Sequence, residues 1–401
     1  MLSSKKGSVT VFLSLMFIAL MIFVIAVIGA ARDKLVDGEA SSLNDIWSDS
    51  ILGEFDRNLY KRYDLLAFQG FNKEIEKELD YYGSCTFSSK SYADFDGYKV
   101  GLNAYSLGKI ENFNASVKHA CTDLKLTKLL NSSEKTSDDV VQRSINNQKI
   151  IKALPSNGEG NVTNGAITSL FEKNKTDVLG NMGNKSYLLI YATRYFNNYT
   201  NGKVNKGSYF RNELEYILSG KMSDKKNLDA FKDKFLLVRI AMNSAYLWSD
   251  KEKMAAVDVI AATLSAATAE TSFTAIRAGL VELWASLEAE NDWKRIKKGK
   301  KVPIRKSDDT WALDSSVLED GEADGVADSE VNKGLNYTEY LQLMISAINT
   351  DTLSLRMMDL IQIDMRYKYY SAFVIGEYNV GIDCSMRVNG KDYEIEKAYY
   401  K

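Results

Sequence analysis

The sequence contains one histidine, two prolines and three cysteines in 401 residues. Because His119 is the only imidazole, an HExxH zinc site is impossible, and a Ser/His/Asp triad would have to use that residue. A pair of His119 with nearby Cys121 is conceivable, but a structural role for the histidine is favoured. Cys85, Cys121 and Cys384 show no CxxC spacing, which disfavours structural zinc and leaves one disulfide open. The scarcity of proline excludes a Pro-rich stalk and fits long helices.

The chain also lacks an excess of charge of either sign. Lys and Arg total 51 against 53 Asp and Glu, so the formal net charge is -2. This balance gives no overall attraction to nucleic acid, and no nucleic-acid partner is predicted. Hydrophobic residues make up 45% of the chain and charged residues 26%, which is the composition of a folded protein.

Catalytic and cofactor motifs are absent too. The stretch Gly180 to Ser186 lacks the Gly-Lys-Ser/Thr ending of a phosphate-binding loop, and Ser223 is interpreted as a helix cap. The acidic stretch Glu319 to Glu330 imitates the start of a calcium loop, but Val331 stands where a bidentate Glu is needed. A solvated loop is favoured over weak calcium binding. We therefore predict no catalytic, cofactor-binding or metal-binding residue, and no enzyme.

What the sequence does contain is one long apolar run near its start. Residues 8–31 carry no charge, and a helix of that length can cross about 30 Å of hydrocarbon. Lys5 and Lys6 precede the run, which predicts a cytoplasmic N-terminus and an extracytoplasmic bulk. A cleaved signal sequence is the rival, since Gly29 and Ala31 are small residues at cleavage spacing. The length of the run favours a retained transmembrane helix in contact with membrane lipid.

The remaining chain is predicted to divide into five parts. Apolar residues at helical spacing continue through a membrane-proximal helix over 32–67, which is either a pilin-like packing spine or a simple stalk. A small mixed α/β region follows over 68–155, with a helix from Ser133 to Leu154, and then a helical domain over 156–293. Within that domain, the apolar stretch Met254 to Leu287 is expected to form a buried helical hairpin and not a second membrane span. Residues 294–333 form a basic hairpin and an acidic loop, and residues 334–401 form helices plus a C-terminal β-hairpin.

Two turn signals define the last two parts. The stretch KRIKKGKKVPIRK, Lys294 to Lys306, with Gly299 at its tip, is interpreted as a basic hairpin. Pairing with the acidic loop is the default for its charges, and contact with wall polyanions is the alternative. The possible polyanion contacts are Lys294, Arg295, Lys297, Lys298, Lys300 and Lys301. Further on, Asn389-Gly390 predicts a tight type I′ turn between two C-terminal strands.

The N-terminal stretch KKGSVTVFLSLMF resembles TadE/TadG-like proteins of Tad (Flp) pilus systems, in which a short basic leader ending in Gly precedes a pilin-type helix. The resemblance implies a leader over residues 1–7, with possible cleavage between Gly7 and Ser8. Phe12 stands where classical type IV prepilins carry Glu. Longer stretches, among them GEFDRNLYKRYDLLAF and KGKKVPIRKSDDTW, resemble an uncharacterised domain-of-unknown-function family associated with such systems in Gram-positive bacteria.

These observations predict a mainly α, α+β protein: a transmembrane helix extended into a long amphipathic helix, a helical exported domain, a small mixed region and a C-terminal β-hairpin. The expected function is that of a single-pass, extracytoplasmic structural or interaction protein, minor-pilin-like or associated with pilus assembly. Its expected partners are other pilus or envelope proteins. The alternative is a membrane-anchored binding module for anionic cell-wall polymers.

Overall fold

The chain folds into two compact units. The computed structural model describes residues 6–122, 150–157, 163–172, 185–202, 207–267, 272–321 and 325–400. The first unit, which we call the sheet unit, comprises Met1–Tyr60, Leu66–Asn112 and Gly376–Lys401. The second, the helical unit, comprises Lys61–Leu65 and Phe113–Ile375. Helices predominate and the sheets are small and antiparallel, which confirms the predicted α+β class.

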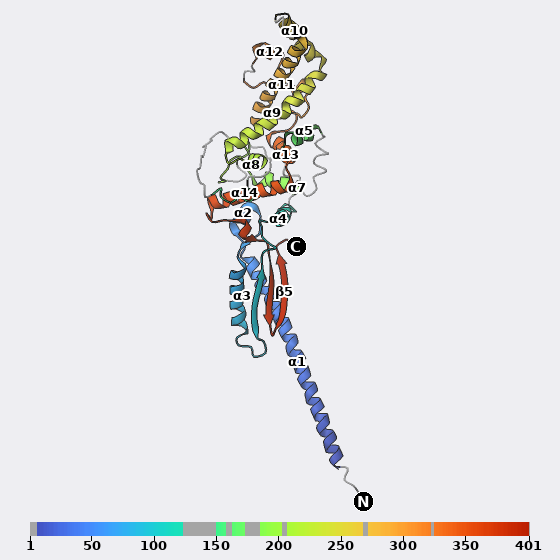
Figure 1. Ribbon diagram of the computed structural model, residues 1–401, viewed down its shortest axis with the longest axis vertical. Helices are drawn as coiled ribbons and strands as arrows, with labels where there is room; N and C mark the ends of the chain where they lie inside the picture. The colour runs from blue at the N-terminus through green and yellow to red at the C-terminus, as the bar shows by residue number, and fades with distance from the viewer. Residues whose placement is uncertain are drawn as a thin grey trace. The chain divides into compact units, whose positions relative to one another are not determined.

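The sheet unit is built around the long N-terminal helix α1 (Lys6–Gly53). Its main sheet has the order β2 (Phe95–Gly101), β4 (Gly381–Val388) and β5 (Lys391–Ala398), with both pairings antiparallel. The C-terminal half of α1 packs on β4 and β5, and α3 (Asn72–Phe87) packs on β2 (Figure 1). A two-stranded sheet joins β1 (Phe68–Gln69) to β3 (Tyr378–Asn379), which follows the short turn η3 (Ile375–Glu377).

One face of the main sheet is buried and the other is exposed. Along β4, Ile382, Cys384, Met386 and Val388 are buried while Asp383 and Arg387 are exposed, the alternation that the period of a strand imposes. The buried side chains form one core with residues of α1 and α3. The helices therefore lie on the same face of the sheet, and the opposite face meets solvent.

The outer edge of β2 is covered by side chains of α3. Three acceptors on one side of this helix, four residues apart, meet alternate backbone N–H groups along the strand. The bonds are Tyr98 N to Asp80 Oδ1 (2.7 Å), Val100 N to Glu76 Oε1 (3.0 Å) and Leu102 N to Asn72 Oδ1 (3.2 Å). An edge strand whose donors are satisfied in this way cannot take up a further strand on that side.

The predicted helix over 32–67 is wrong in its extent. Helix α1 ends at Gly53, and a separate helix α2 (Arg57–Tyr63) follows it. Glycine has a low helix propensity, and the Asp56 carboxylate accepts hydrogen bonds from the N–H groups of Asn58 and Leu59. The cap starts a new helix after the glycine ends the first.

The C-terminal β-hairpin is confirmed. Strands β4 and β5 are joined by Asn389 and Gly390, whose φ angles are 52° and 71°. Both positive angles are those of a type I′ turn, which matches the twist of the flanking strands. The prediction missed that β2 extends this hairpin to three strands.

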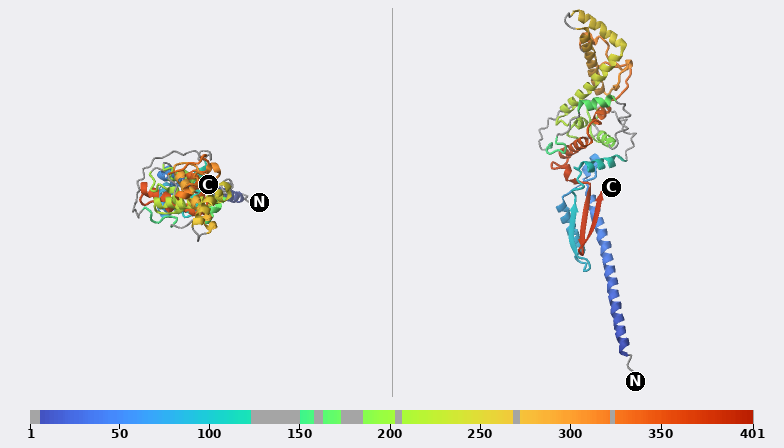
Figure 2. Two further views of the ribbon diagram at one scale, coloured as in Figure 1. Left: turned by 90° about the horizontal axis from the view of Figure 1, so that it is seen from above. Right: turned by 45° about the vertical axis from the view of Figure 1, so that its right-hand side comes forward.

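The helical unit contains most of the remaining elements, which Figures 1 and 2 show. They are α4 (Ile110–Thr122), which begins in the sheet unit, α5 (Asn164–Glu172), α7 (Lys185–Tyr195), α8 (Glu213–Ser219), α9 (Asp224–Ser249), α10 (Lys251–Ala267), α11 (Phe273–Lys297), η2 (Asp308–Thr310), α12 (Val317–Asp320), α13 (Tyr337–Ile345) and α14 (Thr350–Lys368). Helix α9 packs along α11, and α8 packs on α9, α13 and α14. The helix predicted from Ser133 to Leu154 lies mostly outside the described residues.

The apolar stretch Met254 to Leu287 forms two helices packed on each other, as predicted, but they are only partly buried, since Val259, Leu264 and Phe273 are exposed. Helices α10 and α11 pack on each other through a core that includes Val257, Ala261 and Val281. Between them, the Arg277 guanidinium donates to the Asp258 carboxylate at 2.5 Å. Their charges are therefore paired across the hairpin.

Candidate functional site: the apolar helix and the basic segment

The first candidate site is the N-terminal part of α1. Every side chain from Val9 to Ile28 is exposed, although the stretch is almost entirely apolar. Within the part of the chain that the structure describes, α1 is the one helix long and apolar enough to cross a membrane. A helix satisfies its own backbone hydrogen bonds, so this segment can leave water without orphaned polar groups. The exposed surface is chemically suited to lipid or to another apolar helix.

A change from exposed to packed side chains occurs along the same helix. Val36 is the first buried residue of α1, and Ala40 follows one turn later. Near this point Asp37 accepts hydrogen bonds from Lys391 Nζ and from the Tyr393 hydroxyl, both at 2.6 Å. These two donors lower the pKa of Asp37 below its ordinary value. These two contacts thus join α1 to the turn end of the β4–β5 hairpin, shortly after the apolar segment of α1 ends.

The C-terminal half of α1 is held to the sheet by a buried amide. Asn44 is 1% exposed; its Nδ2 donates to the Tyr393 carbonyl at 2.8 Å, and its Oδ1 accepts from the Tyr98 hydroxyl at 3.0 Å. The Asn44 side chain therefore connects β5 and β2 from the buried face of the sheet. Because a buried amide is costly without partners, this arrangement fixes the rotation of α1 relative to the strands.

The predicted leader cleavage point lies at the start of α1. The helix begins at Lys6, so Gly7 and Ser8 are in its first turn. Cleavage between them stays a prediction.

The second candidate site, residues 294–306, is not the hairpin that the sequence suggested. Its first four residues form the last turn of α11, which ends at Lys297, and Gly299 follows two residues later with a φ of 77°. Lys300 N returns to the Arg295 carbonyl at 3.0 Å, as in a glycine-capped helix end. Val302 then pairs with Leu335 through two backbone bonds of 2.8 and 2.9 Å. The segment is thus a helix cap followed by an extended stretch. It is not a hairpin, because the extended stretch pairs with Leu335, which lies far along the chain, and not with a neighbouring strand.

Several of the six cations predicted to contact polyanions are buried or already paired with other side chains of the fold. Arg295 is 1% exposed, donates to Ser329 Oγ at 2.7 Å and is thereby excluded as a surface contact. Lys300 forms an ion pair with Asp328, which supports pairing between the basic segment and the acidic loop. Lys297 lies 5.2 Å from the centroid of the Tyr199 ring. Lys298 and Lys301 are exposed, and Lys294 is half-buried.

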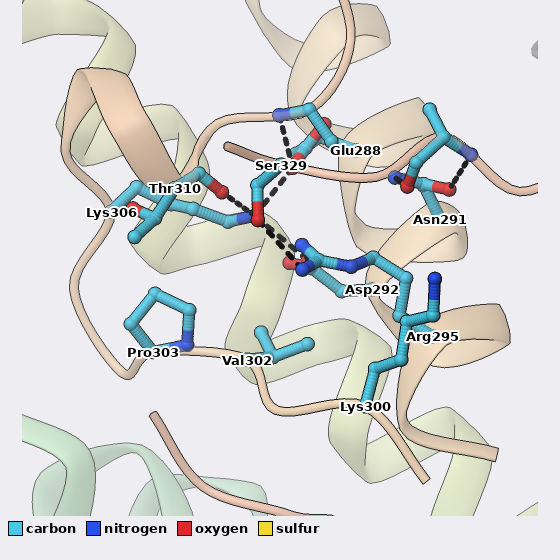
Figure 3. Close-up of polar contacts among 12 residues, drawn as sticks. Glu288, Asn291, Asp292, Arg295, Lys300, Val302, Pro303, Lys306, Thr310 and Ser329 are labelled. Atoms are coloured by element: carbon cyan, nitrogen blue, oxygen red, sulfur yellow. Dashed lines mark hydrogen bonds and ion pairs between the residues drawn. The ribbon is translucent and has the colours of Figure 1, made fainter. Parts of the chain in front are cut away.

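A buried charge cluster behind the basic segment was missed by the sequence prediction. The side chains of Arg239, Glu288, Asp292 and Lys306 are fully buried. Arg239 Nε donates to Asp292 Oδ2 at 3.0 Å. Lys306 Nζ donates to Asp292 Oδ1 at 2.8 Å and to Glu288 (Figure 3). Glu288 also accepts from the backbone N–H groups of residues 312 and 313 at 3.2 and 3.0 Å. Burial raises the pKa of Glu288 above its ordinary value.

One signal in the sequence could have indicated this cluster. Glu288 and Asp292 are four residues apart on α11, so they share one helix face with the buried Trp284 and Ala285. Arg239 and Asn243 have the same spacing on α9 and are also buried. Charged residues that recur on an apolar helix face predict paired buried charges.

The other sequence candidates show no assembled site. Cys85, Cys121 and Cys384 are free thiols. His119 and Cys121 lie on helix α4 and not on a strand; Cys121 is buried, and burial raises its pKa to about 11. Among the described residues, no group of three His, Cys, Asp or Glu could hold a metal ion. Residues 322–324 of the acidic loop lie outside the described part of the chain.

The architecture combines a long helix, a small antiparallel sheet and a helical unit. The first half of the long helix is apolar and exposed, and its second half packs on the buried face of the sheet. The chain belongs to a family of unknown function, DUF5702, which matches residues 108–390. The matched region includes the elements from α4 onward through strand β4, while α1, α3 and β2 precede it. No curated protein and no solved structure matches the chain.

Proposed function

We propose that this protein is a membrane-anchored, extracytoplasmic structural or interaction protein, minor-pilin-like or associated with the assembly of a Tad-type pilus. The observation that supports the proposal is the division of α1 into an exposed apolar half and a half packed under the sheet. A helix of this kind can pack laterally among lipids and other apolar helices while it carries a folded unit on its other end. The resemblance of KKGSVTVFLSLMF to TadE/TadG-like proteins supplies the pilus context.

In this proposal α1 spans the membrane once, with residues 1–7 in the cytoplasm and both folded units outside. Lys5 and Lys6 in the short N-terminal tail support this orientation. The exported units act through protein contacts, and the proposal assigns them no catalysis or cofactor. Protease added to intact cells should therefore digest the helical unit, and full protection of that unit would refute the orientation.

The pilus role is tested by deletion and complementation. Deleting the gene should reduce piliation and surface adhesion, and the wild-type gene should restore both. A variant whose apolar segment can no longer insert should fail to restore them. Unchanged piliation in the deletion strain would contradict the pilus role and leave the membrane anchor to be judged by fractionation.

The binding-module alternative has a weaker basis in the structure. It requires a cluster of exposed cations, whereas Arg295 is buried and Lys300 is paired with Asp328. The exposed members of the predicted set are Lys298 and Lys301. Retention on purified cell wall that depends on these two lysines would favour the alternative over the pilus role.

A further inference from the structure

The buried charge cluster holds an amine, that of Lys306, in contact with two carboxylates, those of Asp292 and Glu288. We propose that Lys306 and Asp292 join through an intramolecular isopeptide bond, with Glu288 as the acid–base group. The bond links the Nζ atom of Lys306 to the Cγ atom of Asp292 and releases one water molecule. It would connect helix α11 covalently to the last residue of the basic segment.

The geometry places a nucleophile, an acceptor and a base in contact. Lys306 Nζ lies 2.8 Å from Asp292 Oδ1 and is hydrogen bonded to Glu288 at the same time (Figure 3). A third bond, 3.1 Å to the Thr310 carbonyl, fixes the direction of the amine. Reacting groups held at this separation behave as if present at a very high effective concentration. The three side chains are fully buried, so water cannot compete with the amine.

Two guanidinium groups lie next to the carboxylate of Asp292. Arg239 binds Asp292 Oδ2 at 3.0 Å, and an Arg295 nitrogen lies 4.0 Å from Oδ1. Both guanidinium groups therefore lie beside the carboxylate that the amine attacks, where they can counter the negative charge that develops on its oxygens. Burial raises the pKa of Glu288, which makes its carboxylate a stronger base for the lysine proton.

The step balances without any other reactant. The Lys306 ammonium gives one proton to Glu288, and the neutral amine attacks Asp292 Cγ to form the new C–N bond. Arg239 stabilises the negative charge that develops on Oδ2, as an oxyanion hole does. The nitrogen then loses a second proton to Oδ1, Glu288 returns the first proton to the same oxygen, and the C–Oδ1 bond breaks to release water. Glu288 ends as a carboxylate, and one proton remains on the amide nitrogen.

Burial also favours the product over the ion pair. A buried ammonium and a buried carboxylate each carry a large desolvation penalty, and condensation replaces both with a neutral amide. Arg239 and Glu288 keep other contacts, whereas the Thr310 carbonyl and Glu288 are left to share the one remaining N–H of Lys306. Arg239 keeps the carbonyls of Pro303 and Ile304 at 2.8 and 2.7 Å and Asn243 Oδ1 at 2.7 Å. Glu288 keeps its two backbone donors.

Mass spectrometry of the full-length protein, purified from membranes in detergent and denatured, tests the proposal. The wild-type mass should be lower than the sequence mass, after allowance for the observed N-terminus, by one water molecule. Trypsin should fail to cut after Lys306 and should yield one branched peptide that links this residue to the peptide containing Asp292. An unmodified mass, with normal cleavage after Lys306, would overturn the proposal. A water loss that maps to another position, such as an Asp-Gly succinimide, would overturn it equally.

Two variants identify the chemistry. Glu288→Gln removes the base and should leave the wild-type bond unformed, with circular dichroism as the check on folding. Asp292→Asn offers an amide in place of the acid, so condensation would release ammonia and give the same product as wild type. Identical final masses for wild type and Asp292→Asn, whose unreacted masses differ, are the expected result. If Glu288→Gln does not fold, the wild-type mass and the branched peptide still decide the outcome.

Discussion

The first prediction concerns membrane insertion of the apolar segment of α1, whose energetics follow from its exposed side chains. Residues 9–28 include fourteen Val, Leu, Ile or Phe residues, each exposed. At about 0.3 to 0.6 kcal/mol each, their insertion contributes about 4 to 8 kcal/mol. One arginine at the helix centre costs about 2.5 to 3.5 kcal/mol, so two cost about 5 to 7 kcal/mol.

A double substitution should therefore remove the net driving force for insertion, whereas a single one should not. We expect Ile18→Arg alone to remain in the membrane pellet after sodium carbonate extraction. The double variant Ile18→Arg/Ile22→Arg should appear largely in the soluble fraction or fail to accumulate. The two positions are 54% and 63% exposed, so neither substitution disturbs packing within the folded units.

A matched control lies farther along the same helix. Leu35 and Ile46 are 56% and 53% exposed on α1 but lie beyond the apolar run. The variant Leu35→Arg/Ile46→Arg adds the same charge and should stay with the membrane. Equal release of both double variants would refute the assignment of residues 8–31 as the anchor. Release of the wild type itself by carbonate would show that the apolar segment is cleaved off.

Three further predictions concern the folded units, each measured by urea unfolding of the full chain in detergent. Asn44→Ala should destabilise the sheet unit by about 1 to 3 kcal/mol, because it leaves the Tyr98 hydroxyl and a buried carbonyl without their partner. Gly390→Ala should cost about 1 kcal/mol, because the residue has a φ of 71°, whereas Gly38→Ala in α1 should be neutral or stabilising. Burial raises the pKa of Glu215 to about 7, so ionisation of this group should lower the free energy of unfolding as the pH rises from 4.5 to about 7. The Glu215→Gln variant should lack this pH-dependent loss of stability.

The sign for Glu215 follows from its protonation states. The carboxyl binds a proton more tightly in the folded chain than in the unfolded one, so folding is favoured at low pH and loses stability as the group is forced to ionise. The rise in pKa from 4.5 to about 7 corresponds to about 3 kcal/mol. The geometry agrees, since one carboxylate oxygen of Glu215 is buried without a hydrogen-bond partner. A difference in stability between wild type and Glu215→Gln that does not change with pH would contradict this reasoning.

The other two predictions have their own refuting results. An Asn44→Ala variant as stable as wild type would contradict the first, and equal effects of the two glycine substitutions would contradict the second.

Much of the local structure could be predicted because it depends on residues close together in the sequence. The C-terminal hairpin follows from Asn389-Gly390, and the α10–α11 hairpin follows from apolar spacing with few charges. The apolar run of α1 is visible in composition alone. Each of these elements is specified by its own propensity, period or turn residues.

The errors came where the outcome depends on distant partners. The basic segment was interpreted as a hairpin because Gly299 stands among lysines, but Val302 pairs with Leu335 and Arg295 faces the core. The division of the chain into consecutive parts missed that the sheet unit uses both chain ends, with Val100 opposite Cys384. Local patterns carry no information about which of several strands will pair across such a separation.

The sequence by itself therefore determined the apolar run of α1, the helical character of the chain and the C-terminal turn, because solvation and backbone preferences act residue by residue. Tertiary structure decided which half of α1 packs under the sheet, how α3 covers the edge of β2, and which charges are buried together. The contact of Lys306 with Glu288 and Asp292 belongs to this second group. A buried charge must find its partners in space, and only the packing of helices and loops brings those partners within reach.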